Sequence, residues 1–281
     1  MFDTKPIPRN KLLQRRLTNV LVTIVACGLL ILVLSDLNRN LLHASYATGY
    51  ILLASLFFLA AFNLRKKFTS LPQIGTASTW MQVHIYVGFS TFLLFGAHVA
   101  WRVPDGWLEG FLAILYLLVA LSGVYGLFIT RVIPKRLTAI GQEVVFERIP
   151  TLRAELALEA RQTAMGTLAA TNVISQFYAQ QLFPFFEQGR GLAYLLLPTG
   201  RKRRQLLGEL DGLKRYLTDD QRRVSTQLMG FVQQKDDLDY HLAMQGRMKA
   251  WLFVHIGFTY SLLAVAVLHA IVVHAFAGGL Q

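Results

Sequence analysis

The sequence has few of the residues that keep soluble proteins in water. Only 16% of its 281 residues are charged, against about 25% in an ordinary soluble domain, and 54% are hydrophobic. Its single cysteine, Cys27, excludes an intrachain disulfide framework, a thiolate metal cluster and the C-x-x-C-H attachment of a c-type haem. No G-x-G-x-x-G phosphate loop occurs in it. This composition indicates an integral membrane protein.

The net charge of +12 does not indicate a nucleic-acid partner, because of where the charge lies. The basic residues are distributed between long apolar runs and do not form one polar, basic domain. We therefore expect membrane lipid, and no nucleic acid, to be the partner of this charge.

Five segments carry the run of about 20 mainly apolar residues that a helix needs to cross a bilayer. The first is long, is soon followed by the second and has no small-residue cleavage site, so we expect a signal anchor rather than a cleaved signal peptide. The predicted fold is all-α, an integral membrane bundle of five transmembrane helices. The predicted spans are residues 17–35, 46–64, 80–101, 107–130 and 250–277.

Lysine and arginine are concentrated in alternate segments between these spans. They fill the N-terminal tail, the loop at residues 65–67 and the long stretch 131–249, which holds 18 basic and 12 acidic residues. The positive-inside rule makes these segments cytoplasmic. Because the number of spans is odd, the N-terminus is predicted in the cytoplasm and the C-terminus in the periplasm.

We therefore expect three parts. Residues 1–130 hold the tail and the first four spans, residues 131–249 form a helical cytoplasmic insertion, and residues 250–281 hold the fifth span and a short outer tail.

Within the insertion, local signals predict where helices begin. Ile149–Pro150 is typical of a helix start, and Thr218 with Gln221 resembles a capping box. The second helix is predicted to continue into the fifth span. The basic cluster at residues 201–204 is expected to face solvent or the anionic leaflet, the alternative being a docking patch for an acidic partner.

The histidines carry the functional signal, because five of the seven lie inside the third and fifth spans, where ionisable groups are costly and usually functional. His84 and His98 are fourteen residues apart, and so are His255 and His269. Fourteen residues bring a helix back to within about 40° of its starting direction and raise it by about 21 Å. Each pair therefore shares one helix face and places one imidazole near each side of the bilayer.

A tryptophan precedes the first histidine of each pair by four residues, at Trp80 and Trp251. Tryptophan favours the membrane interface, so both are expected at the cytoplasmic boundary. The two spans run parallel, and the histidines are then predicted to face each other at two matched heights. Facing imidazoles are what a six-coordinate b-type haem requires, and we predict two such haems. The predicted metal ligands are His84 with His255 and His98 with His269.

Other residues near the ligands are predicted to help hold the haems. Gly88, Gly96 and Gly123 leave room for a porphyrin, although small residues also let helices pack closely without one. Arg102, four residues past His98, is the candidate partner of a haem propionate on the outer side.

The remaining histidines give weaker signals. His274 lies about 140° around the helix from His269, so it is not expected to share the ligand face. With Tyr86 and Asp105 it is a candidate for proton handling near a quinone. His43 and His241 are expected to be ordinary surface residues.

The pattern resembles the transmembrane di-haem b-type cytochromes, and in particular the ferric-reductase-type transmembrane domain. The resemblance covers residues 80–130 and 250–277 and implies that the four histidines ligate two haems b. The chain lacks the flavin and NADPH domain of that family, and the insertion at 131–249 is foreign to it. It is therefore more similar to the membrane cytochrome b subunits of bacterial respiratory complexes.

This resemblance implies an electron-transfer subunit of the bacterial inner membrane, in which any enzymatic activity needs another subunit. Electrons would pass between quinone/quinol, or a cytoplasmic donor, and a partner such as a cytochrome c or an iron-sulfur or flavin protein. Two other interpretations stay open. A histidine-lined proton-coupled transporter predicts no chromophore, and a membrane scaffold predicts that histidine substitutions change little.

Overall fold

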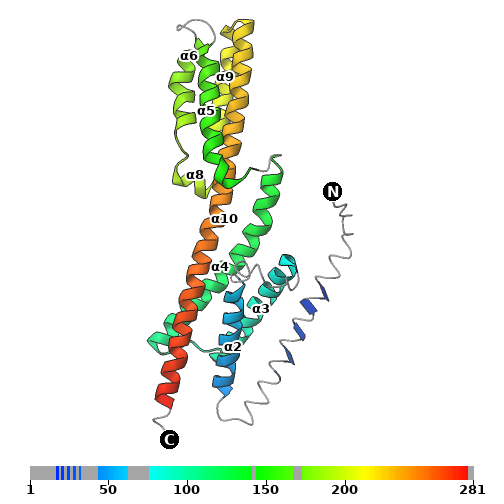
Figure 1. Cartoon of the computed structure of the whole chain (residues 1–281), viewed down its shortest axis with the longest axis vertical. Helices are drawn as coiled ribbons and strands as arrows, with labels where there is room; N and C mark the ends of the chain where they lie inside the picture. The colour runs from blue at the N-terminus through cyan, green and yellow to red at the C-terminus, as the bar shows by residue number, and fades with distance from the viewer. Residues whose placement is uncertain are drawn as a thin grey trace, which may run out of the picture. The chain divides into compact units, whose positions relative to one another are not determined.

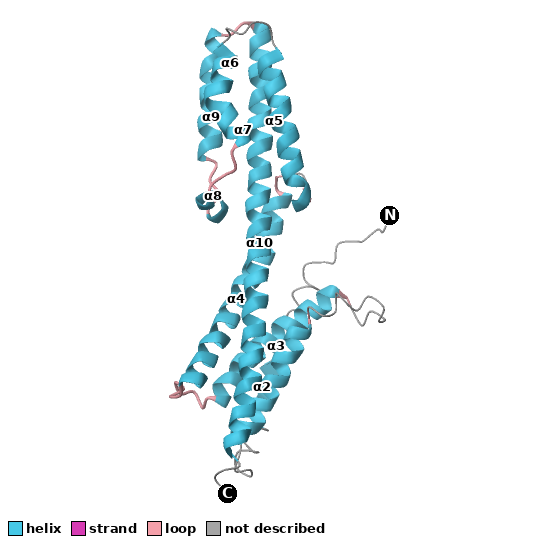
Figure 2. Ribbon diagram, turned by 60° about the vertical axis from the view of Figure 1, so that its left-hand side comes forward, coloured by secondary structure: helices cyan, strands magenta, loops and turns pink. Residues whose placement is uncertain are grey.

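The computed structural model describes residues 44–62, 76–140, 144–166 and 173–277, with scattered positions between residues 17 and 32. All regular structure in these residues is helical, which confirms the all-α prediction (Figures 1 and 2). Most of the predicted first span, 17–35, and all of the loop at 65–67 lie outside the described residues.

The chain divides into two compact units. The apolar unit comprises Met1–Val124 with Val254–Gln281, and the insertion unit comprises Tyr125–Phe253. Two long helices, α4 (Trp107–Thr138) and α10 (Asp219–Ala277), each contribute residues to both units. The unit boundaries lie a few residues inside the apolar spans that were predicted to end at 130 and begin at 250.

In the apolar unit, α2 (Ala44–Ala61) packs against α3 (Ala77–His98). Leu56 of α2, Tyr116 of α4 and Leu262 of α10 share one buried cluster, because each helix turns a leucine or aromatic face toward the others. Phe95 of α3 stacks on Tyr116 with ring centroids 4.2 Å apart. These contacts bring the four helices that carry the candidate residues side by side.

Helix α3 ends earlier than the span predicted at 80–101. Its last residue is His98, after which Ala100 and Trp101 adopt left-handed φ angles of 50° and 55°. The backbone N–H of Trp101 donates to the carbonyl of Gly96 over 2.8 Å, so the chain folds back on the helix end. Arg102 is therefore not one turn further along the face of His98, as the sequence spacing alone suggests.

Among the described residues, two helices are long and apolar enough to cross a membrane, α4 and α10. Helix α2 forms only a shorter apolar helix, and α3 is 22 residues long but is diluted by polar side chains that include His84 and His98. The structure thus supports membrane association, and the five-span arrangement remains a proposal.

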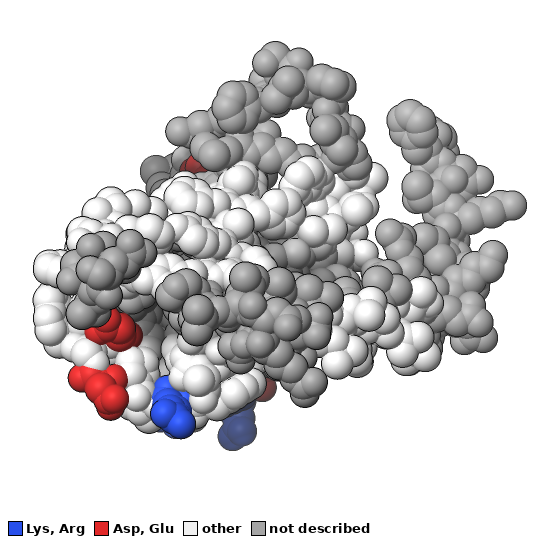
Figure 3. Space-filling view, turned by 90° about the horizontal axis from the view of Figure 1, so that it is seen from below, with Lys and Arg blue, Asp and Glu red and all other residues white. Residues whose placement is uncertain are grey.

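The described residues of the apolar unit carry only three charged side chains. All three lie in or beside the loop between α3 and α4, at Arg102, Asp105 and Glu109. In Figure 3 most of the described surface seen from below is uncharged, and most of its acidic and basic side chains lie toward the lower left. A surface of this kind suits contact with lipid.

The insertion unit is a helical bundle around the first half of α10. Its core includes Leu182, Leu206, Leu228 and Val232, all fully buried. Its helices are η2 (Phe146–Arg148), α5 (Ile149–Gly166), α6 (Val173–Phe177), the π-helix η3 (Tyr178–Leu182), α7 (Phe183–Glu187), α8 (Leu192–Leu196), α9 (Arg201–Leu213) and η4 (Lys214–Tyr216).

Local sequence signals predict two helix starts in this unit, and the structure confirms both. Helix α5 begins at Ile149, and the backbone N–H of Thr218 donates to Gln221 Oε1 over 3.0 Å just before α10. Helix α10 then runs without interruption to Ala277, which confirms the prediction that this helix continues into the apolar segment 250–277.

The prediction that His241 is a surface residue is wrong. Its side chain is only 2% exposed, because it faces the interior of the bundle, where Gln245 Nε2 donates to its Nδ1 over 3.4 Å. Burial lowers the pKa of His241, and the charge of Asp237 opposes that shift. His43 lies outside the described residues.

A buried ionic network also occupies this bundle. The ammonium of Lys235, fully buried, lies 2.6 Å from Asp239 Oδ2, and Arg190 bonds both Asp236 and Asp239. Arg153 lies 3.2 Å from the other oxygen of Asp239. Asp239 thus balances cations from α5, α10 and the segment before α8, and it links these elements.

Candidate functional site

The four candidate ligands lie on two helices of the apolar unit. His84 and His98 are on α3, His255 and His269 are on α10, and all four side chains are half-buried. The helical repeat that was used to predict their shared faces is therefore present in both segments.

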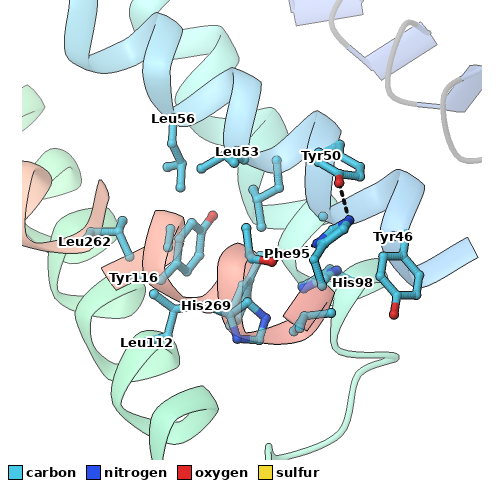
Figure 4. Close-up of a pocket in the computed structure, with 16 residues that line it drawn as sticks. Tyr46, Tyr50, Leu53, Leu56, Phe95, His98, Leu112, Tyr116, Leu262 and His269 are labelled. Atoms are coloured by element: carbon cyan, nitrogen blue, oxygen red, sulfur yellow. Dashed lines mark hydrogen bonds between the residues drawn. The ribbon is translucent and has the colours of Figure 1, made fainter. Parts of the chain in front are cut away.

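His98 and His269 line one cavity of about 280 Å³ (Figure 4). Its walls come from α2, α3, α4 and α10 and are almost entirely apolar, with leucines and the rings of Phe95 and Tyr116. Tyr116 donates a hydrogen bond to Thr91 over 3.1 Å, which satisfies its buried hydroxyl. The cavity is thus largely apolar, and its polar groups are the imidazoles and tyrosine hydroxyls.

Helix α2 holds the ring of His98 in place. The hydroxyl of Thr48, which is buried, lies 3.2 Å from His98 Nδ1. A Cβ on Gly49 would come within 2.9 Å of His98 Cε1, so a glycine is needed for the ring to lie this close to α2. The ring is thereby held with its Nδ1 edge toward α2.

At the other level, His84 and His255 lie close enough for charges on them to repel each other. Ser122 Oγ is 2.5 Å from His255 Nδ1, and the same hydroxyl donates to the carbonyl of Val119 over 3.0 Å. Since a hydroxyl has one proton, its oxygen accepts from the Nδ1–H of His255. In this tautomer of the neutral imidazole, Nδ1 carries the proton and Nε2 is the unprotonated nitrogen.

Two of the four imidazoles have a buried nitrogen that no described residue satisfies, Nδ1 of His84 and Nδ1 of His269. Leaving such a group without a partner costs about 1–3 kcal/mol, so a ligand in contact with it is favoured. Half-buried imidazoles in apolar surroundings are the donors that haem iron takes from proteins. The donor type at each level therefore suits haem iron, and at the His98–His269 level an apolar cavity adjoins the imidazoles.

The described residues contain no group of three or more His, Cys, Asp or Glu side chains that would hold a metal ion by themselves. A bis-imidazole haem does not need one, because the porphyrin supplies four of the six iron ligands.

Of the three glycines and the arginine predicted to help hold the haems, only Gly123 lies beside a candidate ligand. A Cβ on Gly123 would lie 3.7 Å from His255 Cε1, so this glycine is beside a candidate ligand. The space over Gly96 is filled by the indole of Trp101, and Gly88 faces open space. Arg102 is exposed in the loop after α3.

His274 has partners for both ring nitrogens. Its Nδ1–H donates to the carbonyl of Ala270 over 2.7 Å, and its Nε2 accepts from the hydroxyl of Tyr50 over 2.5 Å. It lines the same cavity as His98 and His269, whereas Tyr86 and Asp105 are not part of that lining. Figure 4 shows the hydrogen bond from Tyr50 at the edge of the cavity.

Sequence reasoning missed the contribution of α2. Thr48, Gly49 and Tyr50 are consecutive in a mainly apolar helix; the first two contact His98 and the third contacts His274. The Thr-Gly-Tyr run was a detectable signal, because polar and small residues inside an apolar span usually have a partner.

A comparison with protein-family models, curated proteins and solved structures finds no match to this chain.

Proposed function

We propose that this chain is a di-haem cytochrome b subunit of a bacterial inner membrane that carries electrons across the bilayer. The observation that supports this most strongly is that His98 of α3 and His269 of α10 line one apolar cavity, while His84 and His255 lie on the same two helices. His84 and His255 would hold one haem, and His98 and His269 the other. When bound, each haem supplies a reversible one-electron centre.

The hydroxyls next to the imidazoles orient the ligands. Ser122 accepts from Nδ1 of His255 and Thr48 contacts Nδ1 of His98, so one ligand at each level has a hydroxyl partner. Partners of this kind fix the tautomer and rotation of a metal-binding imidazole. Gly123 and Gly49 leave the space in which those rings lie.

The apolar wall is the second contribution of the protein. Leu56, Leu112 and Leu262 line the cavity beside His98 and His269, and the described helices of this unit carry charges only near the α3–α4 loop. Low polarity around a haem excludes water and helps to set its reduction potential. In that loop, Arg102 remains the candidate partner of a propionate at the His98 level.

We place a quinone, if one binds at this level, beside Tyr50 and His274. A phenol donating to an imidazole is able to exchange a proton with a quinol, and Tyr50 is 52% exposed on the apolar unit, within reach of a lipid-soluble molecule. Tyr50→Phe should slow reduction by a quinol while leaving the oxidised spectrum unchanged. Equal rates in stopped-flow reduction of the two proteins would reject this position.

The remaining electron partner is a separate redox protein. A cytochrome c, an iron-sulfur protein or a flavoprotein would each complete the path, and the insertion unit offers the extended polar surface on which one of them would dock.

The test of the proposed function is haem content. The full chain, expressed with haem available and purified in detergent, should show two b-type haems per chain in a pyridine haemochrome assay and a reduced-minus-oxidised spectrum. A folded preparation without haem would reject the proposal and favour the histidine-lined transporter.

Single substitutions then test the pairing. His84→Ala and His255→Ala should remove the same haem, and His98→Ala and His269→Ala the other, leaving one haem per chain in each case. His274→Gln is the matched control, because both nitrogens of His274 already have protein partners, and it should retain both haems. Loss of different haems from the His84 and His255 variants would contradict the pairing.

A further inference from the structure

Helix α8 of the insertion unit exposes a compact group of leucines. Leu192, Leu196 and Leu197 are 79%, 68% and 75% exposed, although they are large and apolar. Leu192 and Leu196 are one helical turn apart and so share a face. The opposite side of α8 is anchored inward, with the guanidinium of Arg190 4.8 Å above the ring of Tyr194.

The contacts of α8 place it level with the point where α10 becomes apolar. The guanidinium of Arg247, on α10, donates to the carbonyls of Leu195 and Leu196. Arg247 is three residues before the apolar run that begins at Ala250. The exposed leucines are therefore beside the last polar turn of α10 and not at the far end of the bundle.

A second exposed apolar group lies on another side of α10 at the same level. Lys249 pairs with Glu147 over 2.6 Å, and its ammonium is 3.9 Å from the ring centre of Phe146. Next to Phe146, Val145 is 59% exposed. Because Arg247 and Lys249 are about 200° apart around the helix, apolar side chains flank α10 on two sides just before its apolar run.

Basic residues follow α8 directly, at the first turn of α9. Arg203 is paired with Asp237 over 3.3 Å, whereas Arg201, Lys202 and Arg204 form no ion pair within the described part of the chain. Exposed leucines next to unpaired cations are the two components of an interfacial membrane anchor.

We propose that α8 and the start of α9 lie in the interface of the membrane that α10 enters. Leu192, Leu196 and Leu197 insert at the boundary between headgroups and acyl chains. Arg201, Lys202 and Arg204 bind the phosphates of anionic lipids, whose surface potential attracts basic segments. This anchor would fix the orientation of the insertion unit against the leaflet, and it does not depend on the haem proposal.

The depth of single labels in the full chain tests the first half of this proposal. In a Cys27→Ser background, a nitroxide on Leu192→Cys or Leu196→Cys is compared in nanodiscs of phosphatidylcholine and phosphatidylglycerol. Both sites should be more accessible to oxygen than to a water-soluble nickel chelate. Leu158→Cys on α5 is the matched control, a leucine 59% exposed on the same unit, and it should be water-accessible. Nickel access at 192 and 196 equal to that at 158 would overturn the proposal.

Lipid composition tests the basic residues. Removal of phosphatidylglycerol, or the triple change Arg201→Gln, Lys202→Gln and Arg204→Gln, should move the label at position 196 toward water by a measurable increase in nickel access. Three glutamines at Arg215, Arg222 and Arg223 remove the same charge at the opposite end of α9 and the start of α10 and should have no effect. If neither change alters the nickel access of the label at position 196, anionic lipid is not the partner. The same conclusion follows if the label is shielded only after a soluble acidic protein is added.

Discussion

Replacing Ser122 by alanine removes the 2.5 Å contact that holds His255. The Nδ1–H of a half-buried imidazole then has no acceptor, which costs about 1–3 kcal/mol. Loss of such a partner typically weakens metal binding by 10–100-fold, about 1.4–2.8 kcal/mol, and the two ranges agree. Ser122→Ala should therefore bind the haem at the His84–His255 level about 10–100 times more weakly and leave the other haem unchanged.

Haem transfer to excess apomyoglobin measures this effect, with the two haems resolved by the single-histidine variants. Ser122→Thr keeps the hydroxyl and should restore most of the affinity. Ser55→Ala is the matched control, because the hydroxyl of Ser55 bonds only the carbonyl of Ile51 on its own helix. If Ser122→Ala releases haem no faster than Ser55→Ala, the hydroxyl does not orient the ligand and the reasoning fails.

Three further predictions concern both units. Gly49→Val should displace the ring of His98, because a Cβ there approaches Cε1 to 2.9 Å, and haem content should fall from two to one per chain. Asp239→Ala leaves buried cations without their shared carboxylate and should destabilise the insertion unit by about 3–5 kcal/mol in thermal unfolding, whereas the exposed Asp219→Ala should change little. Burial lowers the pKa of His241 in the folded chain. Below about pH 6.5 the unfolded chain therefore binds more protons than the folded one, and the free energy of unfolding decreases as the pH is lowered. His241→Gln should reduce that acid sensitivity in melting curves between pH 7.5 and 5.5.

Each of these three predictions has a measurable outcome that would contradict it. Two haems in Gly49→Val would show that the ring of His98 tolerates displacement. An unchanged melting temperature in Asp239→Ala would mean that the remaining carboxylates balance the cations. An acid sensitivity equal to that of the unaltered chain in His241→Gln would assign the effect to other groups.

Much of this architecture follows from local pattern. Apolar runs and the helix starts at Ile149 and Thr218 predicted helices that the structure contains, because capping and apolar periodicity act within a few residues. The fourteen-residue spacing likewise determined that two histidines share a face on α3 and on α10, since a helix has a fixed repeat.

Tertiary contacts decided the rest. Residues distant in sequence determine that the ring of His98 lies against Thr48 and Gly49 and that His241 is buried. The position of Trp101 over Gly96 depends on a turn that no periodicity encodes. Spacing determines the direction of a side chain around its own helix. Only the packing of the helices determines which hydroxyl, ring or cavity that side chain meets.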